Sequence, residues 1–137
     1  MLHKYTLVPK GPIKNGTCEY SLDPKSGKVT FALKAKVKVL FFSKTIEQAG
    51  TTTVDAKQFL SANAKPGKTL VFGGLHVTIK SVTGQVAICE LRYEDAKMKA
   101  SGTAVLDLSQ EYAVLKSLDA KGRAKGMDIP VILQKVK

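Results

Sequence analysis

The sequence predicts one all-β domain over residues 1–137, an antiparallel barrel or sandwich of about eight or nine strands with one short helix near residues 55–64. Three observations support this prediction. Apolar residues recur at every second position in most segments, which is the period of a strand. Dipeptides that contain glycine separate these segments, as turns do. The chain has 137 residues, of which 44% are hydrophobic, so it can form one packed core and is short for two.

The clearest predicted strand runs from Lys28 to Phe42. One face of it carries seven apolar residues, namely Val29, Phe31, Leu33, Ala35, Val37, Val39 and Phe41. At about 3.3 Å per residue this strand is roughly 50 Å long, so we expect it to bend as barrel strands do. Ahead of it, Asn15-Gly16 is typical of a type I′ hairpin turn, because both residues tolerate positive φ.

A helix is predicted in the middle of the chain. Asp55 and Gln58 have the spacing of a capping box, and Pro66-Gly67 ends the helical pattern. Beyond it, Gly73-Gly74 and Thr83-Gly84 separate three strands of an antiparallel meander, at residues 68–72, 75–82 and 85–93. Alternation resumes over residues 96–108. The last two strands are expected at 112–118 and 129–136, with a loop at 119–128 between them.

The charge of the chain is strongly positive. Lysine and arginine number 22 against 11 acidic residues, and the net charge is +11. Residues 24–46 hold no acidic residue, and Lys34, Lys36 and Lys38 project from one face of the predicted strand. Such a face attracts polyanions or anionic lipid surfaces, and a solvated face that serves only solubility is the alternative. Phe31 and Phe41 point away from these lysines, which disfavours a platform on which nucleic-acid bases stack.

Residues that carry catalytic or metal chemistry are few. Cys18 and Cys89 form no Cys-x-x-Cys pair, so we expect two buried free thiols, with a single disulfide as the alternative. His3 and His76 have no partner at ligand spacing. Gly67-Lys68-Thr69 resembles the end of a P-loop, but the predicted helix precedes it, whereas a P-loop needs the helix after it. The sequence therefore predicts no enzyme, no metal site and no cofactor.

Residues 20–34, YSLDPKSGKVTFALK, resemble the opening of the YceI-like family, and Phe42-Ser43-Lys44 is similar to a later piece of that pattern. The chain is short for the family, and the later histidine-containing segment has no match here. The resemblance implies a lipocalin-like antiparallel barrel that holds an isoprenoid chain. It also implies a periplasmic or extracellular location, which the sequence does not otherwise predict. The first residues lack the apolar segment of a signal peptide, and no apolar run reaches the roughly 20 residues of a membrane-spanning helix.

The predicted function is therefore binding. The leading hypothesis is a carrier or sequestering domain for a lipid or isoprenoid-like molecule, lined by Phe31, Leu33, Val37, Val39 and Phe41. The alternative is a structural or assembly protein, such as a virion or surface component, whose basic face contacts a polyanion or an anionic surface through Lys34, Lys36 and Lys38. An oligomer is compatible with the sequence, and a defined oligomer that carries no ligand would support the structural or assembly function.

Overall fold

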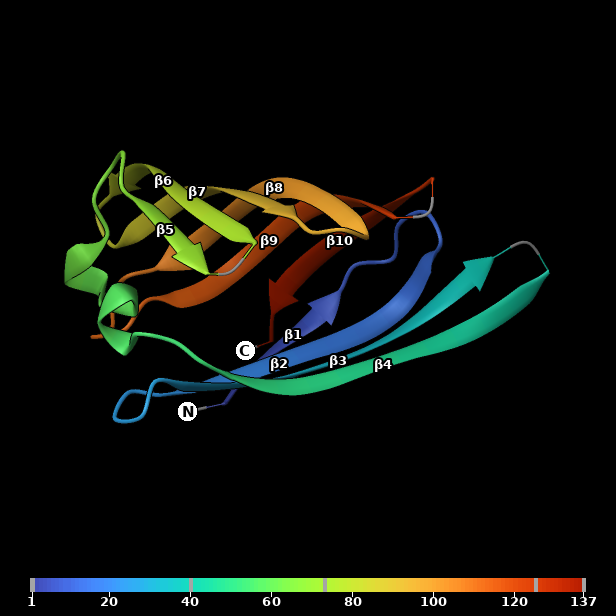
Figure 1. Ribbon diagram of the computed structural model, residues 1–137, viewed down its shortest axis with the longest axis horizontal. Coiled ribbons are helices and arrows are strands. Elements are labelled where there is room, and N and C mark those ends of the chain that lie inside the picture. The colour runs from blue at the N-terminus through green and yellow to red at the C-terminus, as the bar shows by residue number, and fades with distance from the viewer. Residues whose placement is uncertain (1, 40, 73, 125, 137) are drawn as a thin grey trace.

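The computed structural model describes residues 2–39, 41–72, 74–124 and 126–136, and these form one antiparallel sheet of ten strands (Figure 1). Their order across the sheet is β4-β3-β2-β1-β10-β9-β8-β7-β6-β5. The strands are β1 (Leu2–Leu7), β2 (Ile13–Asp23), β3 (Lys28–Val39), β4 (Phe42–Thr53), β5 (Thr69–Phe72), β6 (Leu75–Thr83), β7 (Val86–Glu94), β8 (Met98–Asp107), β9 (Val114–Ala124) and β10 (Met127–Lys135). The predicted all-β antiparallel class is confirmed. Among the described residues β4 and β5 do not pair with each other, so the sheet is not closed.

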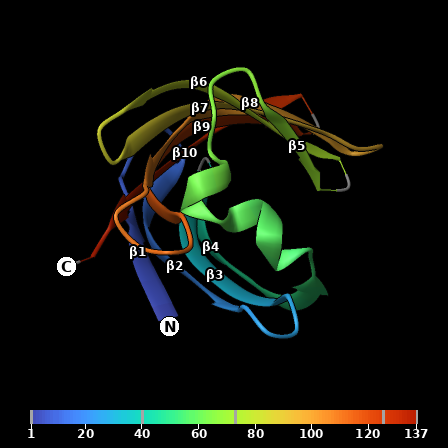
Figure 2. The same cartoon turned by 90° about the vertical axis from the view of Figure 1, so that its left-hand side faces the viewer.

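The sheet bends strongly between its two halves. Viewed from one end, it curves around a central space and leaves its two edges, β4 and β5, facing a gap (Figure 2). Two clusters of buried residues line the inside of the curve: Tyr5, Leu7, Ile13, Ala35, Val37 and Leu133 in one, and Ile79, Ala87, Cys89 and Ala104 in the other. Leu115 and Leu118 of β9 pack against both clusters and so connect them.

The predicted helix at residues 55–64 consists of two short 3-10 turns, η1 (Ala56–Phe59) and η2 (Ser61–Asn63). Asp55 begins the first turn as predicted, since its carboxylate accepts a hydrogen bond of 3.1 Å from the amide of Lys57. Leu60 between the turns is extended and forms a β-bridge with Tyr112. The neighbouring amide of Ser61 donates to the carbonyl of Glu111 at 2.8 Å. These bonds to the β8–β9 loop replace the bonds that a continuous α-helix makes.

The predicted strand from Lys28 to Phe42 ends earlier than its alternation suggested. β3 stops at Val39, and β4 returns beside it from Val39↔Phe42 to Lys28↔Thr53. Phe41 lies in the turn, and Leu40 lies outside the described residues. No glycine or proline occurs between Val39 and Phe42, so the sequence carried no turn signal here.

Two further expectations about turns are wrong. Asn15 and Gly16 lie inside β2, next to an irregularity in its pairing with β3. A Cβ atom at Gly16 would come within 2.7 Å of the carbonyl oxygen of Lys34, so this glycine permits close strand approach and forms no turn. Residues 119–128 are not a loop, because β9 and β10 continue to the pair Met127↔Ala124 and turn at Gly126, whose φ is +75°. The meander of β5, β6 and β7 is confirmed, although Gly73 lies outside the described residues.

Candidate functional site

The strand register divides the residues of the sheet into two faces. Tyr5 lies opposite Cys18, which lies opposite Leu33, so these side chains share a face. On the other side of β1, the same face continues through residues paired in turn: Leu7, Leu133, Leu118, Ala104, Cys89 and Ile79. The buried clusters belong to this face, which lies inside the curve of the sheet. We call it the concave face, and the opposite side the convex face.

The concave face is apolar over most of its extent, yet part of it is open to solvent. Phe31 is 40% exposed, and Ile46 and Met98 are each 37% exposed. The whole chain exposes 8975 Å². A compact monomer of 14.8 kDa exposes about 7,000 Å². The excess of about 2,000 Å² shows that the chain is less compact than a typical monomer of its mass.

The structure brings together three of the five residues predicted to line the interior. Phe31, Leu33 and Val37 share the concave face, and Val37 is buried in the core beside Ala35. The backbone of Val39 pairs with Phe42, but its side chain lies outside the described part of the chain. Phe41 does not line the interior. It is 97% exposed in the β3–β4 turn, because the chain reverses before this residue can continue the alternation.

Two tyrosines cross the concave face, and sequence reasoning missed them. The Tyr5 hydroxyl donates to the carbonyl of Leu115 at 2.6 Å, and the amide of Leu115 donates to the Tyr20 hydroxyl at 3.1 Å. Their rings stack with centroids 5.8 Å apart. Leu115 lies where the β8–β9 register shifts, so the tyrosines satisfy backbone groups near this irregularity. Burial of Tyr5 raises its pKa far above the usual range, and the interaction of its side chain with that of Tyr20 adds to the effect. The phenol of Tyr5 therefore stays protonated.

Two cysteines and one buried amide oxygen are further groups of chemical interest in the described residues. Cys18 is half-buried and Cys89 is buried, both are free thiols, and burial raises the pKa of each. Protonated thiols are poor nucleophiles. No group of three histidine, cysteine or carboxylate side chains that could hold a metal occurs in the described residues. One polar atom facing the interior of the protein is unusual: Oε1 of Gln58 in η1 is buried and has no hydrogen-bond donor within the described part.

Lys34, Lys36 and Lys38 lie together on the convex face of β3, on the side opposite Val37. Lys34 and Lys36 line an open depression of about 320 Å³ with Asn15, Thr17 and Thr45. Nζ of Lys34 is 3.5 Å from Oε1 of Glu47 on β4, and both side chains are well exposed. Lys36 and Lys38 form no ion pair in the described ranges. Their contact with a polyanion or an anionic surface stays a prediction.

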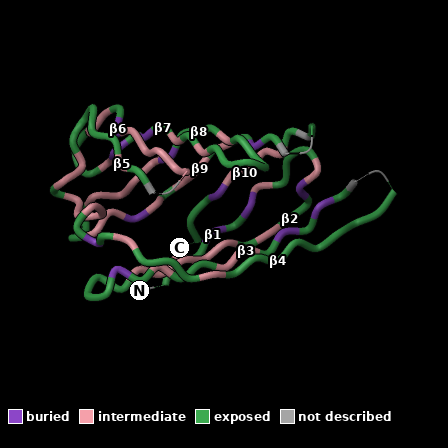
Figure 3. The backbone as a smooth tube through the Cα atoms, in the orientation of Figure 1, coloured by how far each residue is buried: buried purple, intermediate pink, exposed green. Residues whose placement is uncertain are grey.

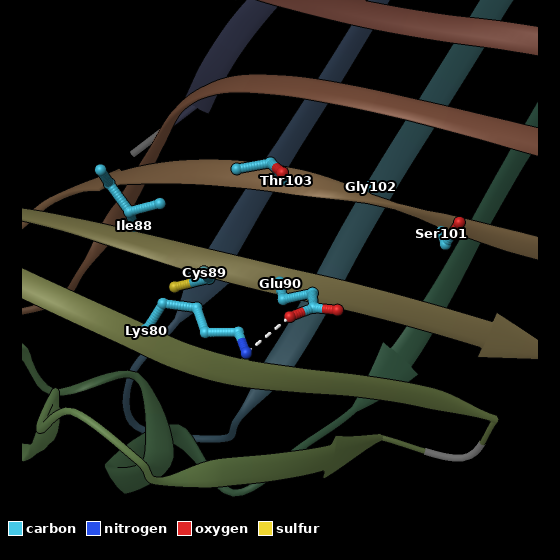
Figure 4. Close-up of a pocket in the computed structure, with 7 residues that line it drawn as sticks. All are labelled: Lys80, Ile88, Cys89, Glu90, Ser101, Gly102 and Thr103. Atoms are coloured by element: carbon cyan, nitrogen blue, oxygen red, sulfur yellow. Dashed lines mark ion pairs between the residues drawn. The ribbon is translucent and has the colours of Figure 1, made fainter.

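A second depression of about 320 Å³ lies on the convex face over β6, β7 and β8 (Figure 4). The charged side chains on it are Lys80 and Glu90, whose Nζ and Oε2 atoms are 2.8 Å apart. Because this pair satisfies itself and solvent reaches both groups, the depression offers no free charge to a ligand.

No family model, no curated protein and no solved structure matches the chain. The resemblance to the YceI-like family therefore stays a prediction. No helix in the described ranges is long and apolar enough to cross a membrane.

Proposed function

We propose that the chain binds an elongated apolar molecule, such as a lipid or isoprenoid chain, on the concave face of its sheet. One observation carries the proposal: large apolar side chains on this face, Phe31 and Ile46 among them, are left partly exposed inside a curved sheet. Monomeric proteins rarely leave a broad apolar surface uncovered unless it binds something.

The physical gain from such binding is considerable. Each 100 Å² of apolar surface removed from water contributes about 2.5 kcal/mol. A chain-like ligand suits this face better than a compact one, because the exposed apolar side chains of Phe31, Ile46 and Met98 lie on three different strands, β3, β4 and β8. The end of the sheet near η1 and η2 is tied to the β8–β9 loop by backbone hydrogen bonds.

The proposal is tested with cis-parinaric acid, a fatty acid whose fluorescence rises when it leaves water. The chain contains no tryptophan, so the emission of the probe is read without that background. We expect saturable binding by the wild-type protein. Leu33→Gln is expected to weaken it at least about tenfold, because a buried leucine side chain contributes about 1.5–3 kcal/mol and the amide must be desolvated.

Thr30→Gln is the matched control. Thr30 is exposed on the same strand and projects from the convex face, so the same side chain is introduced without touching the concave face. Binding by this variant is expected to equal that of the wild type. The proposal fails if the wild type shows no saturable binding, or if both variants lose affinity equally while circular dichroism shows them folded.

A further inference from the structure

We propose that two copies of the chain pair antiparallel through β4, which continues the sheet from one copy into the other around a two-fold axis. The inference does not depend on the proposed ligand. It begins with the edge itself: β4 runs over Phe42–Thr53 and, among the described residues, pairs only with β3. Every residue of β4 except Gly50 is exposed, and Figure 3 shows this strand in the exposed colour along its length.

The β4 edge carries few of the features by which sheet edges avoid pairing. Natural edge strands are short, or carry proline, bulges or several charges. β4 has twelve residues, no proline and an unbroken register with β3, and its charged residues are Lys44 and Glu47. The other edge, β5, has only four residues. A second β4 therefore matches this edge in length, and β5 does not.

The surface area also fits a second copy. A specific interface of standard size covers about 800 Å² on each partner. The chain exposes 8975 Å², which exceeds the about 7,000 Å² typical of its mass by more than one such footprint. The two proposals share Phe31 and Ile46, which the pairing partly covers, whereas Met98 on β8 stays outside this interface.

The alternation of faces limits the register. Directly opposite residues of an antiparallel pair project from the same side of the sheet. For the concave face to continue into the second copy, each β4 residue on the concave face must therefore lie opposite another concave-face residue. The two-fold axis near the middle of β4 then passes at Ile46, Glu47 or Gln48. An axis at Glu47 places two carboxylates directly opposite each other, which is destabilising. An axis at Gln48 places Phe42 opposite residue 54, beyond the end of β4.

An axis at Ile46 gives the best complementarity. Ile46 then faces Ile46 of the second copy, Thr45 faces Glu47, and Lys44 faces Gln48, with no like charges opposite. Phe42, which is 68% exposed, faces Gly50. The ring of Phe31 already lies over Gly50 within each chain, since a Cβ atom there would be 2.9 Å from Cζ of Phe31. Pairing therefore places Phe42 of one copy beside Phe31 of the other, and covers three exposed apolar side chains at once.

Cysteine cross-linking of the full chain reads this register. Residues 46 lie directly opposite in the proposed pair, at the Cβ separation of about 4.5–5.5 Å that permits a disulfide after small adjustment. Ile46→Cys is expected to give a disulfide-linked dimer on mild oxidation. Glu47→Cys and Gln48→Cys are the matched controls and are expected to give little. Efficient cross-linking at Glu47 or Gln48 instead of Ile46 would overturn the register.

Sedimentation equilibrium tests the interface itself. The wild type is expected to be a dimer, and Ile46→Lys to raise the dimer Kd by more than about tenfold, because it places two ammonium groups opposite each other. Thr52→Lys, an exposed position outside residues 42–50, should leave the Kd unchanged. A monomeric wild type, or a dimer indifferent to Ile46→Lys, contradicts the proposal. Parinaric acid binding is read separately, so failure of one proposal leaves the other standing.

Discussion

Replacing Tyr5 by alanine is expected to lower the free energy of unfolding by about 3–5 kcal/mol, the cost of removing a large buried aromatic side chain. Tyr5 is 1% exposed and belongs to the buried cluster that joins β1, β2, β3 and β10. Its hydroxyl also holds the carbonyl of Leu115 across the concave face at 2.6 Å. Urea denaturation followed by circular dichroism measures the change.

Tyr5→Phe separates the hydrogen bond from the packing. It keeps the ring and leaves the Leu115 carbonyl without its donor, so the expected loss is about 1–3 kcal/mol. Because Tyr20 contacts the same residue, Tyr5→Phe and Tyr20→Phe are expected to be non-additive in a double-mutant cycle. Wild-type stability in Tyr5→Ala would show that the two halves of the sheet do not depend on this contact.

Gly102→Ala is expected to lower the free energy of unfolding by about 1–3 kcal/mol or more, because the added methyl group overpacks the space between β8 and β9. A Cβ atom at Gly102 would overlap the carbonyl oxygen of Asp119 and lie 2.5 Å from Cα of Ala120. These are backbone atoms of the neighbouring strand β9, so they cannot move aside as a flexible side chain does. Relief of the overlap requires β8 and β9 to separate.

Gly122→Ala is the matched control for Gly102→Ala. Gly122 lies on the neighbouring strand β9 and shares the concave face with Gly102. The nearest atom to a Cβ at Gly122 is Sδ of Met98 at 3.7 Å, which is an ordinary contact. The melting temperature of the Gly122→Ala variant is expected to stay close to that of the wild type. Equal melting temperatures for Gly102→Ala and the wild type would show that the close approach of β8 and β9 is not needed for the fold.

The fold was predictable where one face of a strand is buried and the other is not. β3 and β8 show alternation of apolar and polar residues, and their existence follows from it. β6 and β7 were predictable because Gly73-Gly74 and Thr83-Gly84 mark where they begin and end. β4 was missed because solvent reaches both of its faces, so its sequence has no reason to alternate. The end of β9 was missed because its concave-face residues, Ala120 and Gly122, are small. Beside charged residues such as Lys121 they give a sequence that is typical of a loop.

The candidate site was predictable in part for a related reason. Periodicity assigns Phe31, Leu33 and Val37 to one face, and the register confirms that they share it. It cannot place the reversal at Phe41, because hydrophobic residues fill that turn. It also cannot reveal the Tyr5–Leu115 hydrogen bond, whose partners are 110 residues apart and meet only when β1 pairs with β10.

Native mass spectrometry of the purified chain incubated with oleic acid tests the central claim most directly, because it reads apolar ligands and copy number in one spectrum. We predict an adduct of one oleate per chain in the wild type and in Thr30→Gln, and a much smaller adduct in Leu33→Gln. Bare chains with no adduct at any oleate concentration, under conditions that preserve folded charge states, would contradict the claim that the concave face binds an apolar molecule.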